Sequence, residues 1–221
     1  MTELVLNVRA VGGRDWATIL FVVCFGLIAI NRAVFETRFA EFIKLAVSDK
    51  YTKIYKDGGN LLSWFTISFF FIQVISFTFL LQFLLHYFKL AEKTSWISFI
   101  QLFTLIAVFI LAKYLIEKII ATSFNIEEFN EQFNLHKVNY RTYIGLLLLP
   151  VNIILFYNDD IHPYVLYGII AIIVAASIIS YLLSLRLYQN LILGKLFYFI
   201  LYLCALEIAP YYFMYYWFTK S

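Results

Sequence analysis

Residues 61–88 read LLSWFTISFFFIQVISFTFLLQFLLHYF and contain no Asp, Glu, Lys or Arg. A helix of about 20 apolar residues crosses the roughly 30 Å hydrocarbon core of a bilayer. This stretch is therefore predicted to be a transmembrane helix. The whole chain agrees, since 63% of its 221 residues are apolar, 20% are aromatic and only 14% are charged. Ordinary soluble domains are about 45–50% apolar, which excludes a disordered chain, a disulfide-rich secreted fold and a soluble nucleic-acid binder.

Further apolar stretches extend the pattern to a single integral membrane domain over residues 1–221. The predicted fold class is all-α, a polytopic bundle of about six transmembrane helices with one or two short interfacial helices. The spans are expected at about 16–33, 61–88, 95–121, 140–157, 164–185 and 191–217. Because no small-x-small cleavage pattern follows the first span, we expect a retained helix and not a signal peptide.

Two of the spans carry residues that affect helix packing. Pro150 predicts a kink in the fourth span, and the neighbouring Asn152 could satisfy the backbone group that the proline frees. Gly168, Ala171 and Ala175 give the fifth span a face of small residues. Small residues let membrane helices approach closely, so the fifth span is expected to be the central helix.

Lysine and arginine are distributed unevenly between the two sides of the membrane. The side that holds the loops after the first, third and fifth spans carries twelve of them, and the other side carries five. The twelve are Arg32, Arg38, Lys44, Lys50, Lys53, Lys56, Lys113, Lys118, Lys137, Arg141, Arg186 and Lys195; the five are Arg9, Arg14, Lys89, Lys93 and Lys220. Because cytoplasmic loops are enriched in these residues, both termini are expected in the periplasm.

Two amphipathic segments are predicted to lie at the membrane surface and not across it. In residues 34–48, Phe35, Phe39 and Phe42 recur at helical spacing among charged residues that include Lys44. This pattern is typical of an interfacial helix, with its apolar face in the lipid, or of a surface that docks a partner. Residues 125–134 form the second segment, which has an acidic face and begins with a capping-box pattern.

Glu207 lies within the last apolar span, about ten residues before its end. A charged side chain at the centre of a bilayer costs about 2.5–3.5 kcal/mol, so such residues are functional candidates by default. Lys113 in the third span lies at a depth from which it could pair with Glu207. Glu117, one turn further along the same helix, is a competing partner for Lys113. The pair is therefore open to a structural interpretation or to a role in proton transfer, substrate contact or subunit contact.

A second polar group is expected on the periplasmic side. Gln82 and His86 share one helix face, and His86 could approach Asp159, Asp160 and His162. Histidine and carboxylate are acceptable zinc ligands, but the spacing matches no metal motif, and no metal site or catalytic residue is assigned. At the end of the last span, Tyr215, Tyr216 and Trp217 belong to an aromatic belt that could face lipid or a partner.

The stretch Phe197–Pro210, FYFILYLCALEIAP, carries a family resemblance. It resembles an integral membrane protein family of Bacteroidota that is known only as a domain of unknown function. The similarity is most specific in this last span, including Glu207 and Pro210. The resemblance implies a bacterial inner-membrane location, and it implies no catalytic residues.

The sequence contains no phosphate-binding glycine loop and no Gly-x-Ser-x-Gly motif. The first hypothesis is a non-catalytic inner-membrane subunit of a larger cell-envelope complex for protein export, lipoprotein handling or envelope assembly. Its expected partners are membrane lipids and other inner-membrane proteins, with no nucleic acid and no cofactor. The alternative is a small membrane-embedded lipid-acting enzyme or transporter that uses Glu207 and Lys113. A third possibility is a scaffold that binds anionic lipid through Lys44 and the lysines that follow it.

Overall fold

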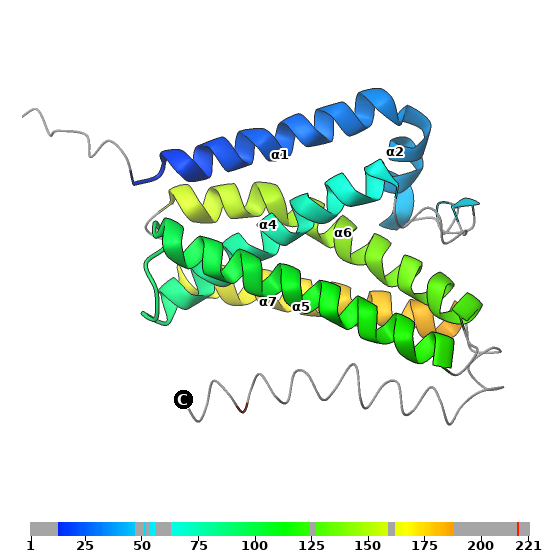
Figure 1. Ribbon diagram of the computed structural model, residues 1–221. Helices are drawn as coiled ribbons and strands as arrows, with labels where there is room; N and C mark the ends of the chain where they lie inside the picture. Colours follow the sequence, from blue (N-terminus) through cyan, green and yellow to red (C-terminus); the bar gives the residue numbers. More distant parts are fainter. Residues whose placement is uncertain are drawn as a thin grey trace, which may run out of the picture.

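The computed structural model describes residues 13–46, 51, 54–55, 63–123, 127–158, 162–187 and 216. These residues form helices and the turns between them, and none of the described residues is in a strand (Figure 1). The helices are α1 (Asp15–Val34), α2 (Glu36–Ile43), the 3-10 helix η1 (Lys44–Ala46), α4 (Trp64–Tyr87), α5 (Trp96–Ser123), α6 (Glu127–Tyr157) and α7 (Pro163–Leu187). The all-α prediction is confirmed for this part of the chain.

Four of these helices are long and apolar enough to cross a membrane: α1, α4, α5 and residues 131–157 of α6. In α7 the apolar stretch is shorter, Tyr164–Ile179. The helix positions agree with the first, second, third and fifth predicted spans to within about three residues. The sixth predicted span, 191–217, lies outside the described residues except for Tyr216.

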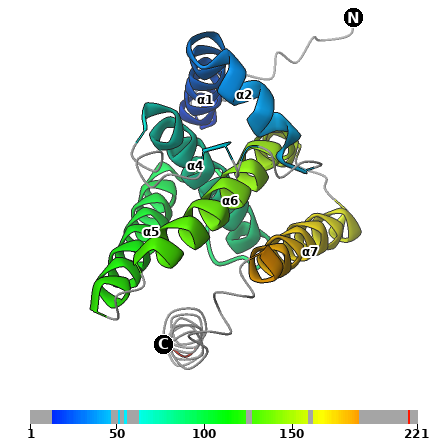
Figure 2. The same cartoon turned by 90° about the vertical axis from the view of Figure 1, so that its right-hand side faces the viewer.

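The central helix of the described bundle is α4. Of its spanning stretch, 61% is buried within the chain, against 22% for α1 and 11% for α5. Figure 2 shows α4 and α6 at the centre, with α1, α5 and α7 around them. This differs from the expectation that the fifth span, now α7, is central. Aromatic rings on several faces of α4 fill the space between helices, whereas small residues permit close packing without requiring it.

A glycine sets the close packing of α4 against α6. A Cβ atom added at Gly145 would lie 2.9 Å from the Cα atom of Gln73. Beside this contact, the Thr142 hydroxyl donates a hydrogen bond of 2.9 Å to Oε1 of Gln73. Further along, Nδ2 of Asn152 donates a hydrogen bond of 2.7 Å to the backbone carbonyl of Ser76. The two helices are therefore joined by both backbone proximity and polar side chains.

Helix α6 is continuous where the sequence predicted an interfacial helix at 125–134 and a separate span from 140. Residues 135–139 contain neither glycine nor proline, so nothing in the local sequence ends the helix. Pro150 lies inside α6, and Figure 1 shows the helix changing direction along its length. Asn152 bonds to Ser76 on α4, and so serves helix packing where the sequence predicted repair of its own backbone.

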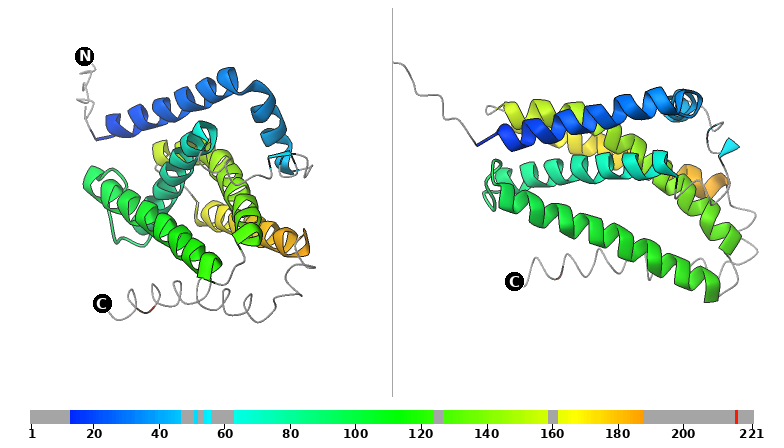
Figure 3. Two further views of the ribbon diagram at one scale, coloured as in Figure 1. Left: turned by 45° about the vertical axis from the view of Figure 1, so that its right-hand side comes forward. Right: turned by 45° about the horizontal axis from the view of Figure 1, so that its top comes forward.

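Helix α2 turns away from α1 and folds back toward the bundle (Figure 3). Phe39 and Phe42 are buried, with Phe42 contacting the rings of Phe65 and Phe69 on α4. These phenylalanines were predicted to face lipid or a partner. They instead complete the hydrophobic core of the chain, because α4 offers aromatic rings at the same level. Phe35 is half-buried against this core, and Lys44 is exposed.

The successive long helices α1, α4, α5, α6 and α7 run in opposite directions, so their ends meet at two levels. At one end, Nε1 of Trp16 donates to the backbone carbonyl of Thr94, and Nζ of Lys93 donates to that of Asn158. We call this the Trp96 end, after the first residue of α5. The opposite end, where α5 finishes, is called the Ser123 end.

Candidate functional site

Four charged side chains on α5 and α6 form the main polar feature near the Ser123 end, and we call them the charged cluster. Lys113 and Glu117 lie one turn apart on α5, and Lys137 and Arg141 lie one turn apart on α6. Nζ of Lys137 is 3.3 Å from Oε1 of Glu117, and both side chains are at least nine-tenths buried. The pair links the two helices, and Lys137 also lies over the ring of Phe133.

The other two members of the charged cluster line a groove between α4, α5 and α6. Its volume is about 320 Å³, and it is partly open to the surroundings. Its walls are apolar except for Lys113 and Arg141: Phe77, Leu80, Leu81, Leu84, Ile106, Phe109 and Ile110. Lys113 is 8% exposed and Arg141 is half-buried. The groove therefore combines an apolar surface with two positive charges, a combination that suits a molecule with a long apolar part and an anionic group.

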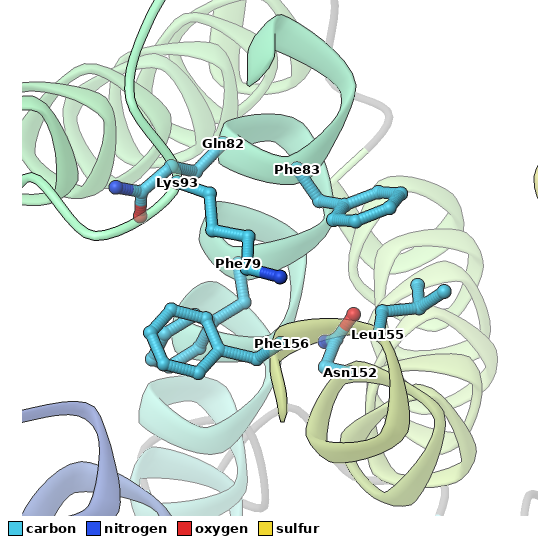
Figure 4. A pocket seen from close by; sticks show the side chains of 7 residues that line it. All are labelled: Phe79, Gln82, Phe83, Lys93, Asn152, Leu155 and Phe156. Carbon is cyan, nitrogen blue, oxygen red and sulfur yellow. The ribbon is translucent and has the colours of Figure 1, made fainter. Parts of the chain in front are cut away.

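A second, much smaller cavity lies near the Trp96 end, between α4 and α6 (Figure 4). Its volume of about 10 Å³ is comparable with the space of one water molecule. Nε2 of Gln82 donates to the backbone carbonyls of Glu92 and Ser95, at 3.3 and 2.9 Å. Lys93 and Asn152 also line the cavity. The two bonds from Gln82 hold the α4–α5 turn in place, and a cavity this small leaves no room for a substrate.

A buried arginine organises the Ser123 end of α4. Arg38 donates hydrogen bonds to the hydroxyls of Tyr51, Ser63 and Thr66, at 3.2, 2.9 and 3.3 Å. Its guanidinium also lies over the rings of Tyr55 and Phe65. Burial raises the pKa of the Tyr51 hydroxyl, although Arg38 opposes the shift. The phenol therefore stays protonated at neutral pH, and the cluster fixes α2 against α4.

The remaining predicted site residues are only partly described. Gln82 is buried, whereas His86 is exposed and has its Nδ1 atom 3.3 Å from the carbonyl of Ala91. His162 is exposed and stacks on Tyr164, and Tyr216 is exposed. Glu207, Asp159, Asp160, Tyr215 and Trp217 lie outside the described residues. Within the described part, no three His, Cys, Asp or Glu side chains gather as metal ligands would.

Sequence reasoning identified Lys113 and Glu117 but missed their neighbours on α6. Lys137 and Arg141 were counted only as cytoplasmic charges, because the spans around them were expected to be separate helices. The signal that could have found them is the four-residue spacing shared by the two helices, which places each pair on one helix face.

Four helices long and apolar enough to cross a membrane, packed around a central helix with buried polar contacts, are features of the helical membrane protein class. The chain belongs to the family described as a domain of unknown function (DUF4271), whose model matches residues 17–218. This confirms the expected resemblance to a domain of unknown function. Comparison with curated proteins and with solved structures gives no significant match.

Proposed function

We propose that the chain is a non-catalytic subunit of a larger complex in the bacterial inner membrane. Protein export, lipoprotein handling and envelope assembly are the settings that fit a membrane subunit of this kind. The polar side chains described inside the bundle support a scaffold role, since Asn31, Thr142 and Asn152 each bond to a neighbouring helix. Such bonds fix the helices relative to one another, so that their outer faces have a defined arrangement to which other proteins can bind.

The observation that carries the proposal is the outward face of α7. Gly168, Ala171 and Ala175 are exposed, and no described atom comes within 4 Å of a Cβ added at Gly168. The opposite face of α7 is the one that packs on the bundle, through Ile169 and Ile173. Helices in lipid associate through small residues of this type, because their backbones can approach closely. The face is suited to a transmembrane helix of another protein.

Topology is part of the same proposal. The Ser123 end would face the cytoplasm, because it holds the ends of the first, third and fifth predicted spans, and the sequence assigns twelve of the seventeen lysines and arginines to that side. Both termini would then lie in the periplasm. The exposed aromatic side chains of Trp96 and Tyr164 fit an interface position at the Trp96 end.

The test is purification of the chromosomally tagged protein from native membranes in mild detergent, after brief chemical cross-linking. The proposal predicts other membrane proteins in fixed stoichiometry with the chain. A chain that is monomeric after cross-linking in intact cells would contradict it.

The alternative of a lipid-acting enzyme or transporter keeps one supporting observation, since Lys113 lines the apolar groove. It predicts that Glu207→Gln abolishes function while abundance and assembly stay normal. A structural Glu207 would instead make the same substitution lower the abundance of the protein. The two outcomes separate the hypotheses in a single strain.

A further inference from the structure

The groove between α4, α5 and α6 has an uneven distribution of charge along its length. Glu117 and Lys137 form an ion pair across α5 and α6. One turn closer to the Trp96 end on both helices, the corresponding positions are Lys113 and Arg141, and both line the groove. The four members of the charged cluster sum to +2, from three cations and one carboxylate. A ligand that complements the groove must therefore be anionic at this point.

Both cations lie at the same depth. From Trp96 to Lys113 is seventeen residues and from Tyr157 to Arg141 is sixteen, which correspond to roughly 26 and 24 Å of helix. The hydrocarbon core is about 30 Å thick. With Trp96 and Tyr157 at one membrane surface, Lys113 and Arg141 lie about 5 Å inside the opposite one. Long basic side chains at this depth reach the level of lipid phosphates.

The rest of the groove is apolar and leads away from the cations. Phe77, Leu81 and Leu84 line it from α4, and Ile106 and Ile110 line it from α5. These residues recur at spacings of three and four, so each set lies on one helix face. A groove of about 320 Å³ is at the lower end of the range for small-molecule sites. It fits part of an acyl chain beside a head group.

We propose that the groove is a binding site for an anionic diacyl phospholipid of the leaflet at the Ser123 end. The phosphate lies between Lys113 and Arg141, where the planar guanidinium can donate two parallel hydrogen bonds and the ammonium acts as a point charge. One acyl chain follows the apolar walls toward the Trp96 end. Basic pockets between transmembrane helices on the cytoplasmic side recognise lipid head groups in this way. The inference is independent of the proposed subunit role.

The test measures lipid affinity of the full-length chain in detergent by native mass spectrometry. Phosphatidylglycerol and phosphatidylcholine of the same acyl composition are titrated separately, so that the lipids differ only in the head group, which is anionic in the first and zwitterionic in the second. The expected result is tighter binding of phosphatidylglycerol. Removal of each cation, in Lys113→Gln and in Arg141→Gln, is expected to weaken it about fivefold. Lys118→Gln is the matched control, because Lys118 is exposed on α5 and does not line the groove.

A second variant distinguishes the loss of lipid binding from misfolding of the chain. Ile110→Trp leaves every charge in place and fills the apolar part of the groove, so it should expel the lipid while the melting temperature stays near that of the parent. Equal affinity for the two lipids, or unchanged phosphatidylglycerol binding in Lys113→Gln, Arg141→Gln and Ile110→Trp, would overturn the proposal. A cysteine cross-link between positions 110 and 207 in a lipid-free chain would also overturn it, since the groove would then hold a segment of the chain itself.

Discussion

Asn152 on α6 donates a hydrogen bond of 2.7 Å to the backbone carbonyl of Ser76 on α4. Both residues are buried, at 1% exposure each. The bond joins the two central helices on the side toward the Trp96 end, close to Pro150 in α6. It therefore holds the bent helix α6 against the central helix α4.

Asn152→Leu should lower the free energy of unfolding by about 0.6 to 1.7 kcal/mol, from the average to the largest value that double-mutant cycles give for hydrogen bonds between membrane helices. Leucine keeps a similar volume but cannot donate to the Ser76 carbonyl. Unfolding in a denaturing detergent measures the change. Ile154→Ala is the control, because Ile154 is 65% exposed and its loss should have little effect. Equal stability of Asn152→Leu and the parent would show that the hydrogen bond contributes nothing.

Gly145→Ala should destabilise the bundle by about 1–3 kcal/mol, the usual cost of overpacking. The new Cβ would lie 2.9 Å from the Gln73 backbone, so α4 and α6 must separate. Gly26→Ala is the matched control, since it adds the same atom to another helix where no described atom lies within 4 Å. The control should be neutral or slightly stabilising, because alanine favours helix. Equal melting temperatures of the two variants would contradict the close approach of Gly145 to Gln73.

Arg38→Met should lower the free energy of unfolding by about 2 kcal/mol or more, because the substitution removes three hydrogen bonds to hydroxyls and two contacts with aromatic rings. Arg38→Lys should recover only part of the loss, since an ammonium cannot reproduce the planar fork of a guanidinium. Thermal unfolding followed by tryptophan fluorescence gives the measurement. Arg32→Gln, at an exposed position of α1, should change stability by no more than about 0.5 kcal/mol. A change in Arg38→Met as small as that would remove the organising role given to Arg38.

The proposed topology predicts opposite labelling of the two ends. In a variant without Cys24 and Cys204, a cysteine at Leu90 should react with an impermeant maleimide in spheroplasts. A cysteine at Ser123 should react only after the inner membrane is opened. Leu90 and Ser123 are both exposed, so accessibility on the protein does not limit either reaction. The reverse pattern would place the Ser123 end in the periplasm.

Much of the fold follows from the sequence because apolar length is a strong signal. The helix bounds of α4 and α5 match the expected spans to within about three residues, since a bilayer requires a minimum run of apolar residues. Contacts between helices are a different matter. Phe39 and Phe42 have the same pattern whether they face lipid or the rings of α4, and only the fold places those rings beside them.

The candidate site was predictable in part for the same reason. Lys113 and Glu117 stand out as charges in an apolar helix, so sequence reasoning found them. Lys137 precedes the fourth predicted span and Arg141 lies at its start, where charges are ordinary, and their role depends on the crossing of α5 and α6. Gly145 looks like any glycine in a span until Gln73 is placed against it.

The subunit role rests on the outward face of α7, and one comparison tests it most directly. The tagged parent and the double variant Gly168→Ile, Ala171→Ile are cross-linked in cells and purified in mild detergent, and their associated membrane proteins are quantified. Val108→Phe serves as control, since Val108 is 59% exposed and the substitution adds bulk to a different helix, α5. The subunit proposal predicts a stoichiometric partner that the double variant loses and the control retains, at equal abundance of the chain. A chain that carries no partner, or a partner retained in full by the double variant, would contradict it.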